Sequence, residues 1–93
     1  MNKEDLKREM NNTIDDLASK INEMEAKKDH VKQEAQSKYH STLQMLREKK
    51  LDLKTKYDDI ENTSGDKWQE IKNSLDSAKD YFKKGVNEMA SAF

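Results

Sequence analysis

The chain has 93 residues, of which 40% are charged and 32% are hydrophobic, and it contains no cysteine and no proline. The lack of cysteine excludes disulfides and thiol chemistry, and a net charge of −1 excludes a strong overall attraction to nucleic acid. Apolar residues never come more than two in a row, so we expect no membrane span, no secretory signal and a cytoplasmic location. A chain this polar buries a seam rather than a deep core, which indicates a single elongated domain.

Residues 2–63 are predicted to form one long helix. Their apolar residues recur at steps of four and three, the spacing of a coiled-coil seam. The first part of the seam consists of Leu6, Met10, Ile14, Leu17, Ile21 and Met24. Lys28 interrupts the seam, Val31 and Ala35 restore it, and the heptad phase slips by one residue in this middle part. The later seam positions are Tyr39, Leu43, Leu46, Lys50, Leu53, Tyr57 and Ile60.

The sequence ENTSGDKW, residues 61–68, is the weakest point of the helical pattern. One interpretation is a turn at about residues 64–66, formed by Ser64, Gly65 and Asp66. Gly65 would then be left-handed past a helix C-terminus, and Asp66 would cap the next helix. The alternative is a continuous helix with Ser64 in the seam. We favour the turn, because poor helix formers cluster here and both cap signals coincide.

A second helix is predicted over about residues 66–92. Its apolar positions form an amphipathic stripe: Trp68, Ile71, Leu75, Ala78, Phe82, Val86, Met89 and Phe93. Folding back at the turn sets residue j opposite about residue 129 − j, so that Asp80 lies near Lys49 and Lys50 and Asp76 near Lys54. The predicted hairpin core consists of Tyr57, Ile60, Trp68, Ile71, Leu75 and Phe82.

The second helix is too short to cover all of the first. The stripe from Leu6 to Met24 is left bare, and exposed stripes of that length mark interfaces. We therefore predict that Leu6, Met10, Ile14, Leu17, Ile21 and Met24 form an oligomer interface in an antiparallel homodimer. The predicted fold class is all-α: a long helix and a shorter helix form a helical hairpin, and hairpins associate into an elongated antiparallel coiled-coil bundle.

No pattern of catalytic residues occurs in the chain, and we expect no enzyme activity, no cofactor and no metal site. His30 and His40 are ten residues apart and do not share a helix face, so they are interpreted as surface residues. The sequence contains no zinc-binding H-E-x-x-H motif, no glycine-rich phosphate loop and no nucleophile elbow. The function expected from the pattern is therefore structural: association through helices.

Two further binding modes are considered. The basic stretch REKKLDLKTK, residues 47–56, offers contacts to phosphate, but Glu48 and Asp52 interrupt it and no aromatic residue is interleaved for base stacking. Nucleic acid is therefore not the expected partner. The stripe of residues 66–92, flanked by lysines, offers a surface for a membrane, and a peripheral lipid-binding protein is the alternative function. Packing of that stripe against protein is the favoured interpretation.

The sequences KYHSTLQMLREKK and SGDKWQEIKNSLDSAKDYF resemble a family of small bacterial coiled-coil proteins, found in cyanobacteria among others, that are described as stress-response or hypothetical proteins. The matching residues are Tyr39, Leu43, Leu46, Arg47, Lys49, Ser64, Gly65, Asp66, Trp68, Ile71 and Lys72, with Leu75, Ala78 and Phe82 in the tail. The Ser-Gly-Asp-Lys-Trp step is the most specific of these features. The resemblance implies a cytoplasmic, non-enzymatic role connected with stress, and it implies no catalytic residue and no ligand.

Overall fold

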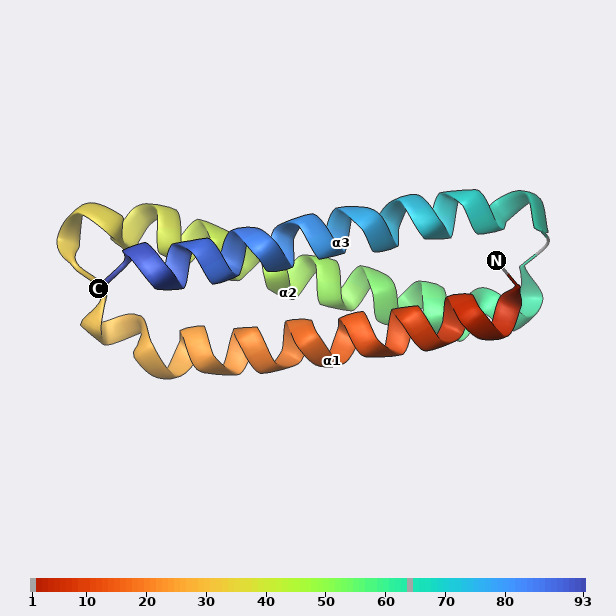
Figure 1. The fold of residues 1–93 in the computed structure, drawn as a ribbon, viewed down its shortest axis with the longest axis horizontal. Helices are drawn as coiled ribbons and strands as arrows, with labels where there is room; N and C mark the ends of the chain where they lie inside the picture. Colours follow the sequence, from red (N-terminus) through yellow and green to blue (C-terminus); the bar gives the residue numbers. More distant parts are fainter. Residues whose placement is uncertain (1, 64) are drawn as a thin grey trace.

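Three α-helices pack side by side in the computed structural model, which describes residues 2–63 and 65–93. Helix α1 spans Lys3–Lys27, α2 spans Gln36–Asp59 and α3 spans Gly65–Ser91. Short 3-10 helices, η1 (Lys28–His30), η2 (Gln33–Ala35) and η3 (Ile60–Asn62), lie between them. Figure 1 shows α1 and α3 running in one direction and α2 in the other, in a bundle of 47 × 17 × 17 Å. The prediction of an all-α helical bundle is confirmed.

The core of the bundle is formed by the apolar stripes of all three helices. Buried hydrophobic residues on α1 are Leu6, Met10, Leu17, Ile21 and Met24; on α2 Tyr39, Leu43, Leu46 and Leu53; and on α3 Ile71, Leu75 and Ala78. Ile14, Tyr57, Trp68 and Phe82 are partly buried against this core. Every predicted hairpin-core and interface residue therefore contacts or belongs to one core within a single chain.

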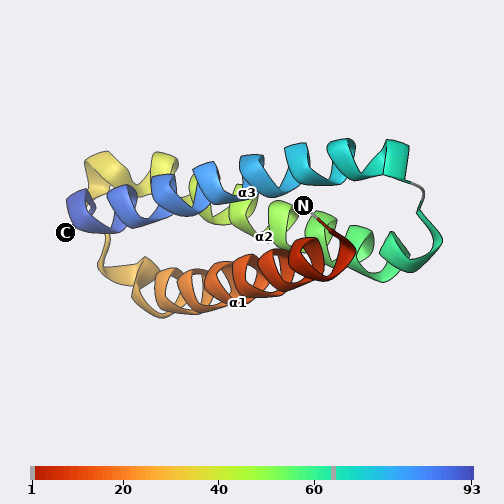
Figure 2. The same ribbon diagram turned by 45° about the vertical axis from the view of Figure 1, so that its right-hand side comes forward.

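The prediction of one continuous helix over residues 2–63 is wrong. Helix α1 ends at Lys27, and the chain reverses through Val31 and Lys32, whose backbones are extended, before α2 begins at Gln36. Figure 2 shows this connection at the end of the bundle where the C-terminus also lies. The reversal occurs because it buries the α1 stripe against α2 and α3, which a straight helix leaves in water.

The stripe from Leu6 to Met24 is consequently not bare in the single chain. Leu6, Met10, Leu17 and Met24 are at most 1% exposed. The antiparallel dimer was predicted because this stripe was expected to be exposed, but the stripe is buried in an interface within the chain. The surface that was expected to cover this stripe from a partner is supplied by α2 and α3 of the same chain.

The second reversal lies at the turn expected from the sequence, between η3 and α3, but its local geometry differs from the prediction. Gly65 is the first residue of α3, and no described glycine has a positive φ. Asp66 is the second residue of α3, so it belongs to the first turn rather than capping the helix. Ser64 lies outside the described residues. Gly65 therefore acts as a helix start, a position that requires no left-handed backbone.

Candidate interaction surface

Helix α2 carries the densest basic stretch of the chain, and its cations divide between two sides of the helix. Lys56 donates to Asp52 Oδ1 at 2.9 Å and to Ser74 Oγ on α3 at 2.7 Å. The Lys49 amine lies 5.2 Å from the centroid of the Tyr81 ring, also on α3. These contacts follow the expected antiparallel register of α2 and α3. Both lysines are engaged by the bundle itself and contribute to holding α3 in place.

The other side of α2 faces the groove between α2 and α1. Arg47, Lys50, Leu51 and Lys54 are spaced i, i+3, i+4, i+7 and therefore share one helix face. Together with Ile21 of α1 they line a groove of about 330 Å³. We call these five residues the basic groove. Leu51 is 68% exposed, more than any other large hydrophobic residue in the described part of the chain.

Two of the three cations of the basic groove are available for a partner. Lys50 and Lys54 form no ion pair with any residue in the ranges 2–63 and 65–93. From the sequence, Lys50 was expected near Asp80 and Lys54 near Asp76 of α3; in the structure both line the groove beside Ile21 of α1. Within the described residues, the cation contacts from the basic stretch to α3 are made by Lys49 and Lys56.

Arg47 is held at the edge of the groove by α1. Its guanidinium contacts the Glu25 carboxylate, which also accepts a hydrogen bond from the Lys28 amine. The bond from Lys28, together with the charges of Lys28 and Arg47, lowers the pKa of Glu25, and the same carboxylate raises the pKa of Lys28. A guanidinium has five N–H donors, so the contact with Glu25 does not use all of the donors of Arg47. Arg47 thus fixes the edge while Leu51, Lys50 and Lys54 remain open.

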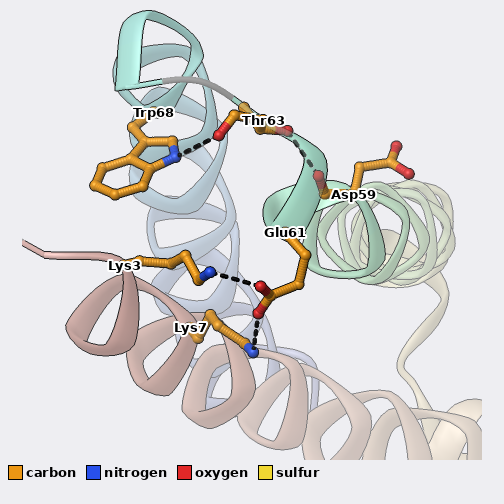
Figure 3. Close-up of polar contacts among 6 residues, drawn as sticks. All are labelled: Lys3, Lys7, Asp59, Glu61, Thr63 and Trp68. Carbon is orange, nitrogen blue, oxygen red and sulfur yellow. Dashed lines mark hydrogen bonds and ion pairs between the residues drawn. The ribbon is translucent and has the colours of Figure 1, made fainter.

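A second cluster of polar contacts closes the opposite end of the bundle (Figure 3). Glu61 accepts from Lys3 at 2.5 Å and from Lys7 at 2.8 Å, which joins the start of α1 to η3. These two bonds lower the pKa of Glu61 to about 2. The Trp68 indole donates to the Thr63 carbonyl at 3.3 Å, and the Thr63 hydroxyl donates to the Asp59 carbonyl at 2.7 Å. All these groups are satisfied by one another, which indicates a structural role.

Most of the apolar stripe of α3 is buried in the bundle. Ile71, Leu75 and Ala78 are buried, and Trp68, Phe82 and Met89 are partly buried against the core. Only Val86, 40% exposed, and Phe93, 53% exposed, are open to solvent. None of the helices in the described ranges has an apolar stretch long enough to cross a bilayer.

Titratable side chains do not assemble into a metal site in the described parts of the chain, where no group of three or more His, Cys, Asp or Glu side chains converges. His30 is exposed in η1 and His40 is exposed in α2. The surface hollow beside Trp68 has a volume of about 300 Å³ and is lined by Leu6, Gly65, Trp68, Gln69 and Lys72. Lys72 is the one positively charged side chain among these lining residues. In the basic groove, the most exposed large hydrophobic residue of the described ranges lies beside two lysines that form no ion pair there.

No family model, curated protein or solved structure matches this chain. The resemblance to small bacterial stress-response proteins accordingly stays a prediction. The basic groove is therefore interpreted from its own residues, their exposure and their charge.

Sequence reasoning identified the basic stretch but missed Leu51. The signal was present, because Leu51 falls outside the seam that contains Leu46 and Leu53. An apolar residue outside the buried stripe of an amphipathic helix is either incidental or part of a contact surface. Its position between two unpaired lysines became visible only when α1 was placed beside α2.

Proposed function

We propose that this chain is a non-enzymatic interaction protein, and that its basic groove binds an acidic amphipathic segment of a protein partner. The observation that carries the proposal is the exposure of Leu51, 68%, between Lys50 and Lys54, neither of which is paired within the described residues. A partner with one apolar side chain flanked by carboxylates complements this arrangement in both polarity and charge.

The expected affinity follows from the size of the groove. Full burial of a leucine side chain stabilises a complex by about 1.5–3 kcal/mol, and charge pairs at an exposed rim add about 0.2–1 kcal/mol each. Residues 47–54 span only about 10 Å along a helix, so the contact is smaller than a standard stable interface. We therefore expect weak, transient binding that becomes weaker as salt concentration rises.

A protein partner is favoured over nucleic acid by the chemistry of the groove. Its centre is an aliphatic side chain, and no aromatic residue lines it for stacking on a base. Glu48 and Asp52 lie on the same helix beside the cations and repel a phosphate backbone. A segment with separate carboxylates can place each of them on a lysine and avoid these acids.

The proposal is tested with a fluorescent synthetic helix that has one leucine flanked by glutamates three and four residues away on both sides. Anisotropy in low salt should show binding, and Lys50→Glu/Lys54→Glu should weaken it about tenfold or more through charge reversal. Leu51→Ser should weaken it as well, since it removes the apolar contact without disturbing the core. Lys67→Glu/Lys83→Glu, at two exposed positions of α3, changes the net charge by the same amount and is the matched control; it should leave binding unchanged.

Two outcomes contradict the proposal. One is an equal loss of peptide binding in Lys67→Glu/Lys83→Glu, which would indicate general charge attraction only. The other is tighter binding of a duplex DNA or RNA probe than of the peptide, with a steep dependence on salt. Retained binding in Leu51→Ser would remove the apolar part of the proposal.

The lipid-binding alternative has less support, because Ile71, Leu75 and Ala78 of the α3 stripe are inside the bundle. A membrane would have to draw α3 away from α1 and α2 to reach them. The connection with bacterial stress and the cytoplasmic location rest on the resemblance and on the sequence alone.

A further inference from the structure

The connection between α1 and α2 reverses the chain with very little departure from helical geometry. Lys28 and Gln36 have helical backbones, and η1 and η2 are themselves short helices. Only Val31, with φ −72° and ψ 132°, and Lys32, with φ −62° and ψ 149°, are extended. We call residues 28–35 the hinge. To join α1 and α2 into one helix, Val31 and Lys32 would change from extended to helical, with smaller adjustments at Lys27 (φ −106°, ψ 3°), at Ala35 (φ −102°, ψ −8°) and in the two 3-10 turns.

The hinge sequence KDHVKQEA does not by itself require a reversal. It contains no glycine and no proline, and Lys, Gln, Glu and Ala are good helix formers. Val31, Ala35 and Tyr39 continue the apolar spacing of α1 into α2, which is why the sequence predicts a continuous helix. The local preference of the hinge and its observed conformation therefore disagree.

Tertiary contacts are what keep the hinge closed. Val31 is only 4% exposed, and its carbonyl accepts from the Gln36 side chain at 3.3 Å. The Lys32 N–H donates to the carbonyl of Ala92, near the end of the chain, at 2.9 Å. A continuous helix would lose these few contacts but would form additional backbone hydrogen bonds across the hinge, which favour the open form.

The large interface that α1 makes with α2 and α3 does not depend on which chain supplies α1. If the hinge straightens in two chains, the α1 of each can occupy the same place on the α2 and α3 of the other. The buried stripe of Leu6, Met10, Leu17 and Met24 and the contact between Glu25 and Arg47 then recur between chains. Exchange of an identical element is a low-cost route to a dimer, because it uses contacts that already exist.

We propose that this chain forms an antiparallel homodimer by exchange of α1, with the hinge as the element that opens. The dimer has two continuous helices over residues 3–59, each about 85 Å long at 1.5 Å per residue, in place of a bundle of 47 Å. Each basic groove in it combines α2 of one chain with Ile21 of the partner subunit. If the groove binds as proposed above, the dimer therefore presents two grooves, one toward each end.

A substitution at Gln33 can distinguish the monomer, in which the hinge is closed, from the exchanged dimer, in which the helix is continuous. It is the exposed first residue of η2, so its N–H has no partner inside that helix, and Lys32 before it has the extended backbone that proline favours. Gln33→Pro is thus compatible with the closed hinge. In a continuous helix the same change removes the bond to the carbonyl of Asp29 and causes a clash there. Gln33→Ala, which keeps the N–H, is the matched control.

The experiment refolds each variant at several hundred micromolar, then measures mass by light scattering and maximum dimension by X-ray scattering. The unmodified chain and Gln33→Ala should give a fraction with twice the 10.9 kDa chain mass and a dimension near that of the long helix. Gln33→Pro should reduce this fraction about tenfold or more while remaining a folded monomer. Asp29→Ala/His30→Ala, which raises the helix preference of exposed hinge residues, should increase it.

A second measurement identifies exchange directly through the contact of Glu25 with Arg47. Glu25→Arg and Arg47→Glu each place like charges together within a chain. Mixed and refolded, the two variants restore both opposite-charge pairs only if α1 is exchanged, so heterodimers should exceed the statistical half at low salt. The proposal is overturned if no dimer forms even with Asp29→Ala/His30→Ala, if Gln33→Pro dimerises equally well, or if the mixture shows no excess of heterodimer. Peptide binding to monomeric Gln33→Pro reports on the groove independently of these results.

Discussion

The two glycines of α3 occupy opposite environments, although both are helical. Apart from its chain neighbours and the backbone of its own helix, a Cβ at Gly65 would have no atom within 4 Å, whereas a Cβ at Gly85 would lie 3.0 Å from Leu46 Cδ1 and 3.3 Å from Lys20 Cγ. Gly65→Ala should therefore stabilise the protein by about 0.4–1 kcal/mol, because alanine restricts the unfolded chain and fits the native backbone. Urea unfolding measures the change, and a loss of stability would contradict the helical start observed at Gly65.

Gly85→Ala is the matched comparison and should have the opposite sign. Leu46 is fully buried, so it has little room to move away from a new methyl group. Overpacking costs about 1–3 kcal/mol, which exceeds the gain of about 1 kcal/mol in helix propensity. The same unfolding series should show a lower free energy of unfolding for this variant. Equal stabilisation by both substitutions would mean that the close approach of α3 to α2 is not maintained in solution.

Glu61 gives the fold a dependence on acid pH. Hydrogen bonds from Lys3 and Lys7 lower its pKa from 4.5 to about 2 in the folded chain. A carboxyl with a depressed folded pKa contributes stability above its unfolded pKa, and that contribution is lost as pH falls from about 4.5 to about 2. Glu61→Gln should therefore lower the Tm at pH 7 and have progressively less effect toward pH 2. Because the contact is exposed, salt should also reduce the difference between the two proteins. A difference independent of pH would exclude this role.

At the scale of the helices, Tyr39 connects the start of α2 to the end of α1. Its buried hydroxyl donates to the Met24 carbonyl at 2.6 Å, and burial raises its pKa. Tyr39→Phe should destabilise the protein by about 1 kcal/mol, the usual value for a net hydrogen bond. Tyr57→Phe is the control, since that partly buried hydroxyl only accepts from Asn11 at 3.3 Å and its loss should be nearly neutral. If Tyr39→Phe and Tyr57→Phe change the free energy of unfolding in urea equally, the hydrogen bond to the Met24 carbonyl does not contribute to stability.

The α2–α3 hairpin could be predicted from the sequence, whereas the α1–α2 hinge could not. Residues 62–66 combine several poor helix formers, so a local signal marks the turn before α3. In the hinge the residues favour helix, and the reversal is decided by burial of the distant α1 stripe. The seam break at Lys28 and the phase slip were the only local signs, and both fall at or close beside the hinge.

The basic groove was predictable only in part for the same reason. The cations of residues 47–56 are evident in the sequence, and the register of α2 against α3 correctly places Lys49 toward α3. Which cations remain free depends on the position of α1, and that position follows from the hinge. The hinge brings Ile21 of α1 beside Lys50 and Lys54, which the sequence pattern alone did not indicate.

At the scale of the whole molecule, folding into one bundle decides how much apolar surface is left for a membrane. The α3 stripe keeps only Val86 and Phe93 substantially exposed, so an intact bundle has little to insert into lipid. The net charge of −1 also provides no general attraction to an anionic surface. We therefore expect that the chain does not float with vesicles containing phosphatidylserine at physiological salt.

The informative variant for this prediction is one that frees α3 without changing its own residues. Leu17→Asp places a carboxylate in the α1 side of the core, where Leu17 has no exposed surface, and should loosen the bundle strongly. If this variant floats with the vesicles while the unmodified chain does not, lipid affinity is a property of released α3 that the bundle suppresses. If the unmodified chain floats, and Val86→Ser with Phe93→Ser abolishes flotation at unchanged helicity, the exposed end of α3 is a lipid-binding surface. That result would make peripheral membrane binding the better account of the function. If neither protein floats, the apolar stripe serves the bundle alone, and the basic groove remains the surface through which this chain is expected to meet its partner.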